Sequence, residues 1–208
     1  MSPEIDLIRQ ALKAKLPGRV SQYKMAPSDR AIRDKALNTK ELKQSAVLVL
    51  LFYIDKKLHL LLTQRAKYNG PHSGQISFPG GKFEATKDHN LLDTVIRETQ
   101  EEIGLKKEDY QIIGELTSLN IPVSKTSVQS FVAFCSDISK STADQIEVTD
   151  LYHIPIAHLL NPKNLKTKVN QTVSYPYYDF EGKVVWGATA MIISELLEII
   201  NTKAIAKN

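Results

Sequence analysis

Three glutamates within a span of five residues are the part of this sequence best suited to chemistry. Glu98, Glu101 and Glu102 lie in the segment Leu91–Ile103, whose apolar residues recur with the period of an α-helix. At about 100° per residue the three carboxylates share an arc of about 100°, beside an apolar stripe that would pack on a sheet. Like charges at this spacing repel, and Mg²⁺ or Mn²⁺ binds oxygen ligands of this kind. The spacing therefore indicates a metal site, with a solvated acidic helix face as the alternative.

Arg97 and nearby glycines flank this acidic stripe. Arg97 immediately precedes Glu98 and could orient the carboxylates by bidentate pairing. Gly104 follows the segment, as expected of a residue that ends a helix. Upstream, Gly80 and Gly81 are adjacent, and adjacent glycines let a backbone approach a ligand or metal closely. A tight turn is the alternative for the glycine pair alone, so the interpretation depends on its combination with the helix.

The glycine pair and the acidic helix together resemble the Nudix box of the Nudix hydrolase superfamily. That pattern is Gly, five residues, Glu, seven residues, Arg-Glu-aliphatic-any-Glu-Glu-any-Gly-aliphatic. Thr99 stands where the pattern has an aliphatic residue, and Gly81 lies two positions further from Arg97 than in the pattern. Asp88 is the best counterpart of the first Glu, which in the family packs on the helix or forms a salt bridge. The residues that match the second half are Arg97, Glu98, Glu101, Glu102, Gly104 and Leu105.

A second resemblance, to the coenzyme A pyrophosphatase branch of that superfamily, lies upstream. The segment Leu61–Gly81 is similar to the branch motif Leu-Leu-Thr-any-Arg, a gap, and then Gly-any-any-any-Phe-Pro-Gly-Gly. Gly70 occupies the place of a basic residue in that gap, and Lys67 and His72 are neighbours that could replace it. The longer spacing of the box also occurs in this branch. The resemblance covers about residues 45–200, because two later segments also look like the branch, Tyr178–Gly182 and Trp186–Ala190.

The resemblance implies a metal-dependent hydrolase that cleaves the pyrophosphate bond of coenzyme A or its derivatives to phosphopantetheine and adenosine 3′,5′-bisphosphate. Mg²⁺ or Mn²⁺ would be held by the three glutamates with a backbone carbonyl of Gly80 or Gly81, and would lower the pKa of a bound water. The general base stays open between a helix glutamate such as Glu98 and a later acid such as Glu147. The residues implied for catalysis are Glu98, Glu101, Glu102 and Arg97. Those implied for the metal are Glu98, Glu101, Glu102 and Gly81, and those for the substrate are Arg65, Lys67, His72, Gly80 and Lys82.

Other functions are compatible with the same box. Within the pyrophosphatases, ADP-ribose, NADH or another nucleoside diphosphate derivative could be the small-molecule substrate. An isomerase of isopentenyl diphosphate shares the fold but needs a catalytic cysteine, and Cys135 lies on an apolar segment far from the box. A non-catalytic Nudix domain that senses a ligand often loses box carboxylates, whereas all three glutamates remain here. The retained carboxylates therefore favour catalysis.

The elements that must position these residues follow from periodicity and turn signals. Strands outnumber helices, which predicts an α+β fold, a Nudix-like α/β/α sandwich with a mixed β-sheet. Residues 19–43 are polar and basic, and we expect them to form an irregular arm. The predicted helices are Glu4–Lys15, Leu91–Ile103 and Ala188–Ile200, with a helical turn at Ile156–Leu160. The predicted strands are Ala46–Ile54, Leu58–Gln64, Gln75–Phe78, Tyr110–Leu119, Ser127–Cys135, Leu151–Ile154, Ser174–Phe180 and Lys183–Trp186.

Length and charge set limits on organisation and partners. The 208 residues fit an N-terminal helix and basic arm over residues 1–43, followed by a Nudix hydrolase domain over residues 44–208. The net charge of +4 suits phosphorylated small molecules, and without a Lys/Arg run interleaved with aromatics we expect no binding of nucleic acid. No segment approaches the ~18 apolar residues of a membrane span, and the start lacks the apolar run of a signal peptide. With a single cysteine, Cys135, we expect a cytoplasmic protein without membrane contact, and a homodimer stays open.

Overall fold

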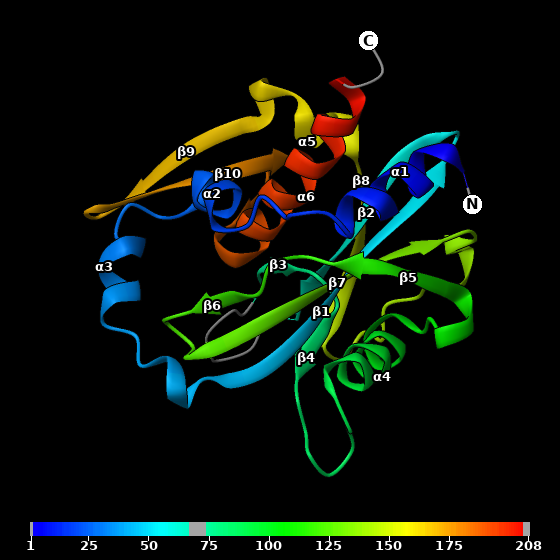
Figure 1. Ribbon diagram of the computed structural model, residues 1–208, viewed down its shortest axis with the longest axis horizontal. Coiled ribbons are helices and arrows are strands. Elements are labelled where there is room, and N and C mark those ends of the chain that lie inside the picture. Colours follow the sequence, from blue (N-terminus) through cyan, green and yellow to red (C-terminus); the bar gives the residue numbers. More distant parts are fainter. Residues whose placement is uncertain (1, 67–73, 206–208) are drawn as a thin grey trace.

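The computed structural model describes residues 2–66 and 74–205, except for the side chains of residues 202–205. Helix α4 covers one face of a mixed sheet, and α1 and α6 cover the other (Figure 1). This α+β sandwich confirms the fold class predicted from the sequence. The helices are α1 Pro3–Leu12, α2 Arg19–Gln22, α3 Arg30–Lys35, α4 Leu91–Ile103, α5 Ile156–Leu160 and α6 Gly187–Ile205. The strands are β1 Lys43–Ile54, β2 Lys57–Arg65, β3 Ile76–Ser77, β4 Gly80–Lys82, β5 Tyr110–Glu115, β6 Leu119–Ile121, β7 Thr126–Cys135, β8 Val148–Pro155, β9 Leu165–Asn170, β10 Val173–Phe180 and β11 Lys183–Trp186.

Strand β1 divides the core between the two faces of the sheet. Its residues Leu48 and Leu50 pack under α4, whereas Val49 and Leu51 pack under α1 and α6. Successive strand residues point to opposite faces, so a strand covered on both sides needs a continuous apolar run. β1 pairs in parallel with β7 and antiparallel with β2 and β4, which makes the sheet mixed. The strand order is β3-β2-β1-β7-β5, with β4 also beside β1, β6 beside β7 and β8 beside β2.

Helix α4 has the bounds that the sequence predicts. The side chain of Asn90 accepts hydrogen bonds from the backbone N–H groups of Leu92 (2.8 Å) and Asp93 (3.1 Å), which caps the first turn. Gly104 ends the helix in the left-handed region, at φ +72°, where glycine is favoured. The side chains that α4 buries are Thr94, Val95, Thr99, Glu102 and Ile103. One of the three glutamates therefore belongs to the buried face of the helix.

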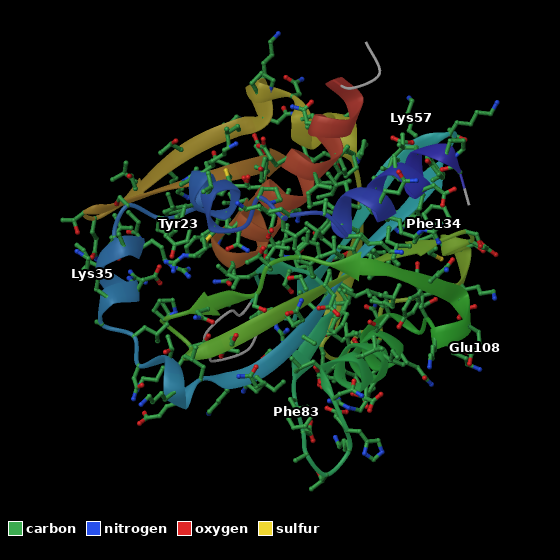
Figure 2. All side chains as sticks on the ribbon, viewed as in Figure 1. Tyr23, Lys35, Lys57, Phe83, Glu108 and Phe134 are labelled. Atoms are coloured by element: carbon green, nitrogen blue, oxygen red, sulfur yellow. The ribbon has the colours of Figure 1, made fainter. Side chains whose placement is uncertain are left out.

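The segment that follows α1 is more regular than the irregular arm predicted for residues 19–43, and this prediction is wrong. Short helices form there and pack toward α6, with Gln22, Met25 and Arg30 buried. Figure 2 places Tyr23 and Lys35 of this segment on the same side of the molecule. Buried polar side chains need hydrogen bonds rather than apolar neighbours, and hydrophobic periodicity does not detect them. No helix within the described ranges combines the length and apolarity that crossing a membrane requires.

One strand prediction needs correction, and β9 lies where the sequence predicts no strand. The single strand predicted over Tyr110–Leu119 is two strands, β5 and β6, which both pair with the long strand β7. The sequence pattern does not reveal β9, because every residue of this edge strand is exposed and no apolar alternation marks it. The hairpin predicted across Glu181 and Gly182 is confirmed, and both turn residues have positive φ.

Candidate active site

The three glutamates of α4 differ sharply in their exposure to water. Glu102 is only 3% exposed, and its Oε2 accepts a hydrogen bond of 2.9 Å from the backbone N–H of Gly80. Glu98 is half-buried, and the side chain of Glu101 is 56% exposed. The acidic stripe predicted from the sequence thus runs from the buried edge of α4, beside β4, out to solvent.

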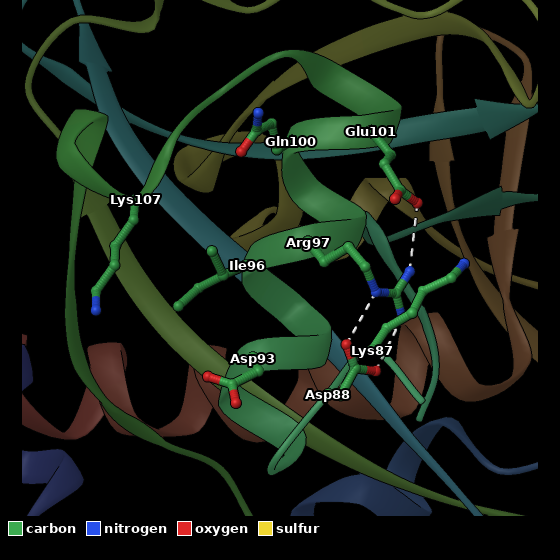
Figure 3. Close-up of a pocket in the computed structure, with 8 residues that line it drawn as sticks. All are labelled: Lys87, Asp88, Asp93, Ile96, Arg97, Gln100, Glu101 and Lys107. Carbon is green, nitrogen blue, oxygen red and sulfur yellow. Dashed lines mark hydrogen bonds and ion pairs between the residues drawn. The ribbon is translucent and has the colours of Figure 1, made fainter. Parts of the chain in front are cut away.

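Arg97 orients two of these carboxylates. Its Nη1 donates to Glu98 Oε1 (2.8 Å) and to Glu101 Oε2 (3.3 Å). Its Nε and Nη2 donate to the two carboxylate oxygens of Asp88, each at 2.9 Å (Figure 3). Asp88 is buried, and the Arg97 guanidinium holds its pKa well below the usual range. Asp88 therefore acts as the salt-bridging counterpart expected of it.

The pocket drawn in Figure 3 lies on the outer side of this ion pair. It has a volume of about 560 Å³, and Ile96, Gln100 and Lys107 line it together with Arg97 and Glu101. Neither Glu102 nor Gly80 lines it. This hollow is therefore distinct from the place where Glu98 and Glu102 meet β4.

Two glycines bring the backbone of β4 against the helix carboxylates. Gly80 has φ +144°, and a Cβ there would overlap the carbonyl oxygen of Ala46 on β1. A Cβ on Gly81 would overlap the Glu98 carboxylate. The glycine pair is therefore required by close approach as well as by backbone conformation, as the sequence interpretation proposed.

Burial raises the pKa of the two inner carboxyl groups. Desolvation is the main cause that raises the pKa of Glu102 to about 7, against the lowering effects of the Gly80 N–H and the Arg65 charge. Desolvation also raises the pKa of Glu98, while Arg97 opposes this. The negative charges of Glu98 and Glu147 contribute to the raised pKa of Glu102. These carboxylates therefore repel one another in a poorly solvated place, where a cation would relieve the repulsion.

Arg65 and Glu147 reach the same place from two other elements. Arg65 ends β2, and its Nη1 lies 3.8 Å from Glu102 Oε1. Its Nε is buried and has no hydrogen-bond partner in the described part of the chain. Glu147 is exposed, and its backbone carbonyl accepts a hydrogen bond of 2.7 Å from the N–H of Ala66, the residue after Arg65. Its negative charge contributes to the raised pKa of both Glu98 and Glu102. Helix α4, β2 and the loop before β8 thus converge around Glu102.

Asp144 positions Glu147 and was not singled out by the sequence interpretation. Its carboxylate accepts hydrogen bonds from the backbone N–H groups of Glu147 (3.1 Å) and Val148 (2.8 Å). Its own N–H donates to the backbone carbonyl of Glu102 (3.1 Å), which ties the loop to the end of α4. Asp144 lies four residues before β8, and an Asp in such a loop is a turn signal that could have identified it.

Some predicted substrate residues are placed differently. Lys82 is exposed, and its backbone carbonyl accepts a hydrogen bond from Arg97 Nη2 (3.3 Å). Lys67 and His72 lie outside the described residues. Cys135 is a buried core residue that pairs with Phe52 across β1 and β7, as expected of a packing thiol.

The donor set fits a hard divalent cation, although the carboxylates are not arranged around one point. Within residues 2–66 and 74–205, no three His, Cys, Asp or Glu side chains form a ready metal-binding group. Arg97 holds Glu98 and Glu101, and the Gly80 N–H holds Glu102. The mutual repulsion of the buried carboxylates and their all-oxygen chemistry suit Mg²⁺ or Mn²⁺.

Comparison with known proteins assigns the family. The model of the NUDIX domain matches residues 42–169, more than half of the chain. A Pectobacterium atrosepticum protein named uncharacterized Nudix hydrolase NudL is 31% identical over 180 residues, covering 84% of this chain and 88% of that protein. A Schizosaccharomyces pombe protein named probable Nudix hydrolase is 32% identical over 159 residues, or 75% of this chain, which spans only 55% of that relative. The chain belongs to the Nudix family.

Solved structures agree with this fold. A MutT/Nudix family protein from Enterococcus faecalis has a TM-score of 0.53 at 16% identity, covering 97% of this chain and 75% of that one. A C. elegans Ap4A hydrolase in a binary complex has a TM-score of 0.52 at 17% identity, covering 79% of this chain and 99% of that one. Similarity at these identities shows the fold alone. By family the chain is an enzyme, a Nudix pyrophosphatase that hydrolyses a phosphoric anhydride bond in a nucleotide derivative.

Proposed function

We propose that this enzyme cleaves the pyrophosphate bond of coenzyme A or its derivatives, giving phosphopantetheine and adenosine 3′,5′-bisphosphate. The observation that carries the proposal is the meeting of the α4 glutamates with β4 and with Arg65, because Arg65 and the glycines belong to the segment Leu61–Gly81 that resembles the coenzyme A branch. Arg65 lies beside a buried carboxylate and is 29% exposed, so it can also contact an incoming anion.

In this proposal Glu98, Glu101 and Glu102 hold Mg²⁺ or Mn²⁺, together with the backbone carbonyl of Gly81. When bound, the cation supplies charge for the pyrophosphate oxygens and lowers the pKa of a bound water. Arg97 orients Glu98 and Glu101, and Asp88 keeps Arg97 in place. Phosphoryl transfer needs mainly such positioning and charge.

Glu98 and Glu147 are the two candidates for accepting the proton of the attacking water. Glu147 is exposed on a loop whose backbone is hydrogen-bonded to Ala66 after β2 and to Glu102 at the end of α4, whereas Glu98 is bound by Arg97. This difference supports Glu147, since a general base must be free to receive a proton. The predicted cytoplasmic location and a homodimer stay predictions.

The branch is tested by comparing coenzyme A with dephospho-coenzyme A, ADP-ribose and NADH. We expect coenzyme A to be the best substrate. It differs from dephospho-coenzyme A by its 3′-phosphate, and a charge-assisted bidentate contact from Arg65 to that group contributes roughly ten- to a hundredfold in activity. Arg65→Ala should reduce the preference for coenzyme A over dephospho-coenzyme A and mostly raise KM, because the contact is made equally in the ground and transition states. Arg65→Lys, which retains the charge but not the bidentate geometry, should lie between the two.

A wild-type enzyme that prefers ADP-ribose or NADH by tenfold or more would refute the coenzyme A branch. Such a result would not affect the assignment of the carboxylate site on α4. A preference for coenzyme A that is unchanged in Arg65→Ala would place the phosphate contact on another residue.

A further inference from the structure

A second pocket lies between the N-terminal segment and β6. It has a volume of about 430 Å³, within the range typical of pockets for small molecules. We call it the N-terminal pocket. Figure 2 shows Tyr23 and Lys35 on this side of the molecule, near α2 and α3. Its main polar lining residues are Arg19, Gln22, Tyr23, Arg30, Asp34 and Lys35.

Positive charge dominates this pocket. Arg19, Arg30 and Lys35 line it, and Asp34 is its only acidic lining residue. The Arg19 side chain is 68% exposed, and one Asp34 carboxylate is shared between Arg19 and Arg30. Lys35 is exposed and forms no ion pair with another residue of the described part of the chain. The lining therefore retains a positive charge that an anion would neutralise.

Arg30 is an unusual member of this lining because it is 8% exposed. Its Nε donates to Asp34 Oδ1 (2.9 Å), its Nη2 donates to the backbone carbonyl of Asn120, and its Nη1 contacts the sulfur of Met191 at 3.6 Å. A thioether is a weak acceptor, so one side of this buried guanidinium has a poor partner. Burial of an arginine is costly unless its donors are well paired.

Gln22 adds an unpaired acceptor to the same pocket. Its side chain is fully buried, and its Nε2 donates to the Thr117 carbonyl (2.8 Å) and to Glu195 Oε2 (2.9 Å). Its Oε1 has no hydrogen-bond partner in the described part of the chain. A buried acceptor without a partner is rare in native proteins and calls for a donor. Because this oxygen is itself inaccessible, the pocket offers a ligand the cationic donors of Arg19 and Lys35, which suit an anionic group.

The N-terminal pocket is separate from the carboxylate site. Leu119 in its wall pairs with Val128 on β7, Val128 with Ser45 on β1, and Ser45 with Lys82 on β4. Three strand spacings of this kind correspond to about 14 Å. Moreover, α2 packs toward α6, whereas α4 packs on the opposite face of the sheet. No side chain of the pocket can therefore share a small anion with Glu102.

We propose that the N-terminal pocket binds the phosphomonoester group of a small molecule such as a nucleoside phosphate. Arg19 and Lys35 bind the phosphate, and the remaining part of the ligand occupies the rest of the pocket. The phosphate belongs to a free nucleotide, because the 3′-phosphate of coenzyme A lies on the same ribose as the pyrophosphate and does not span three strand spacings from β4. The inference does not depend on the proposed coenzyme A activity, because it concerns binding at a different place.

Calorimetry with adenosine 3′,5′-bisphosphate, in the presence of chelator and without divalent metal, tests the inference. We expect saturable binding that Arg19→Ala and Lys35→Ala each weaken by about three- to tenfold, as for partly solvated charge-assisted contacts. Arg33→Ala is the matched control, since Arg33 also lies on α3 but pairs with Asp29 and does not line the pocket. It should leave the Kd within about twofold. Adenosine, which lacks phosphate, should not bind.

Three results would overturn the inference. They are absence of binding to the wild-type protein, an equal effect of Arg33→Ala, and binding that Arg65→Ala abolishes while Arg19→Ala leaves it intact. The last result would place the nucleotide beside α4.

Inhibition kinetics with coenzyme A distinguish binding in the N-terminal pocket from binding beside α4. Inhibition that is only competitive and that Arg19→Ala leaves unchanged would place the bisphosphate beside α4 alone and contradict the inference. A non-competitive effect that Arg19→Ala relieves identifies a free nucleotide.

Discussion

Glu102 carries a carboxylate that the fold shields from water on the buried edge of α4. Its raised pKa of about 7 makes the free energy of unfolding depend on pH, because the unfolded chain would ionise the same group near pH 4.3. Between these two pH values the folded state binds a proton that the unfolded state has released. Stability therefore falls as pH rises through this window, and it levels off above pH 7.

The Glu102→Gln variant removes this loss of stability at rising pH. Glutamine keeps an oxygen for the Gly80 N–H but carries no charge to desolvate. Without divalent cations, we expect it to be more stable than wild type by about 1–3 kcal/mol at pH 8, and equal to it near pH 4. Urea titrations at both pH values measure this. Glu101→Gln, at an exposed position of the same helix, is the control and should show little difference. A wild-type-to-variant difference that does not change with pH would contradict the assignment.

At the level of secondary structure, β4 packs against the carboxylates of α4 because Gly81 has no side chain. Because a Cβ on Gly81 would overlap the Glu98 carboxylate, Gly81→Ala should displace Glu98 from its position beside Arg97. We expect kcat/KM to fall on the order of a hundredfold, with a stability cost of about 1–3 kcal/mol. Steady-state kinetics and thermal unfolding measure the two effects.

The matched control is Gly182→Ala in the β10–β11 turn. Gly182 has positive φ, but no atom lies within 4 Å of a Cβ built there. This change should cost about 1 kcal/mol of stability and leave catalysis intact. Equal activity of the two variants would mean that the contact between β4 and Glu98 is not needed.

The helices and strands differ in how well the sequence predicts them. Helix α4 is predictable because Asn90 caps it, Gly104 ends it and its apolar stripe is regular. The unequal burial of Glu101 and Glu102 is not predictable, since it depends on how far the helix is rotated against the sheet. The helices after α1 escape detection because their buried residues include Gln22 and Arg30, whose burial depends on partners far along the chain. Likewise, the loop that holds Glu147 meets the ends of β2 and α4 only through tertiary folding.

Across the whole molecule, Glu195 of α6 connects the two ends of the chain. This fully buried carboxylate accepts hydrogen bonds from the backbone N–H of Gly18 (3.0 Å), the side chain of Gln22 (2.9 Å) and the hydroxyl of Thr117 (2.6 Å). Its removal would leave several buried donors without an acceptor. The predicted division at residue 43 stays a prediction, but this network favours unfolding of both parts together.

Glu195→Ala should therefore destabilise the protein by about 2–4 kcal/mol. We expect a single transition, with the same midpoint for far-UV circular dichroism and for the fluorescence of Trp186. Glu198→Ala is the control, because the ion pair of Glu198 with Lys24 lies at the surface and is worth at most about 1 kcal/mol. Separate transitions for the two probes would show instead that the N-terminal segment folds independently.

The α4 carboxylates are expected to support metal-dependent cleavage of a pyrophosphate. The measurement is product analysis by mass after incubation with coenzyme A, ADP-ribose and NADH, with Mg²⁺ or Mn²⁺ and then with chelator. Wild type and Glu102→Gln are compared with Glu108→Gln, an exposed glutamate beyond the end of α4 (Figure 2). We expect cleavage that chelator abolishes, a loss on the order of a hundredfold or more in Glu102→Gln, and normal turnover in Glu108→Gln. Hydrolysis that resists chelator, or wild-type turnover of Glu102→Gln at saturating metal, would contradict a role of the α4 carboxylates in metal-dependent catalysis.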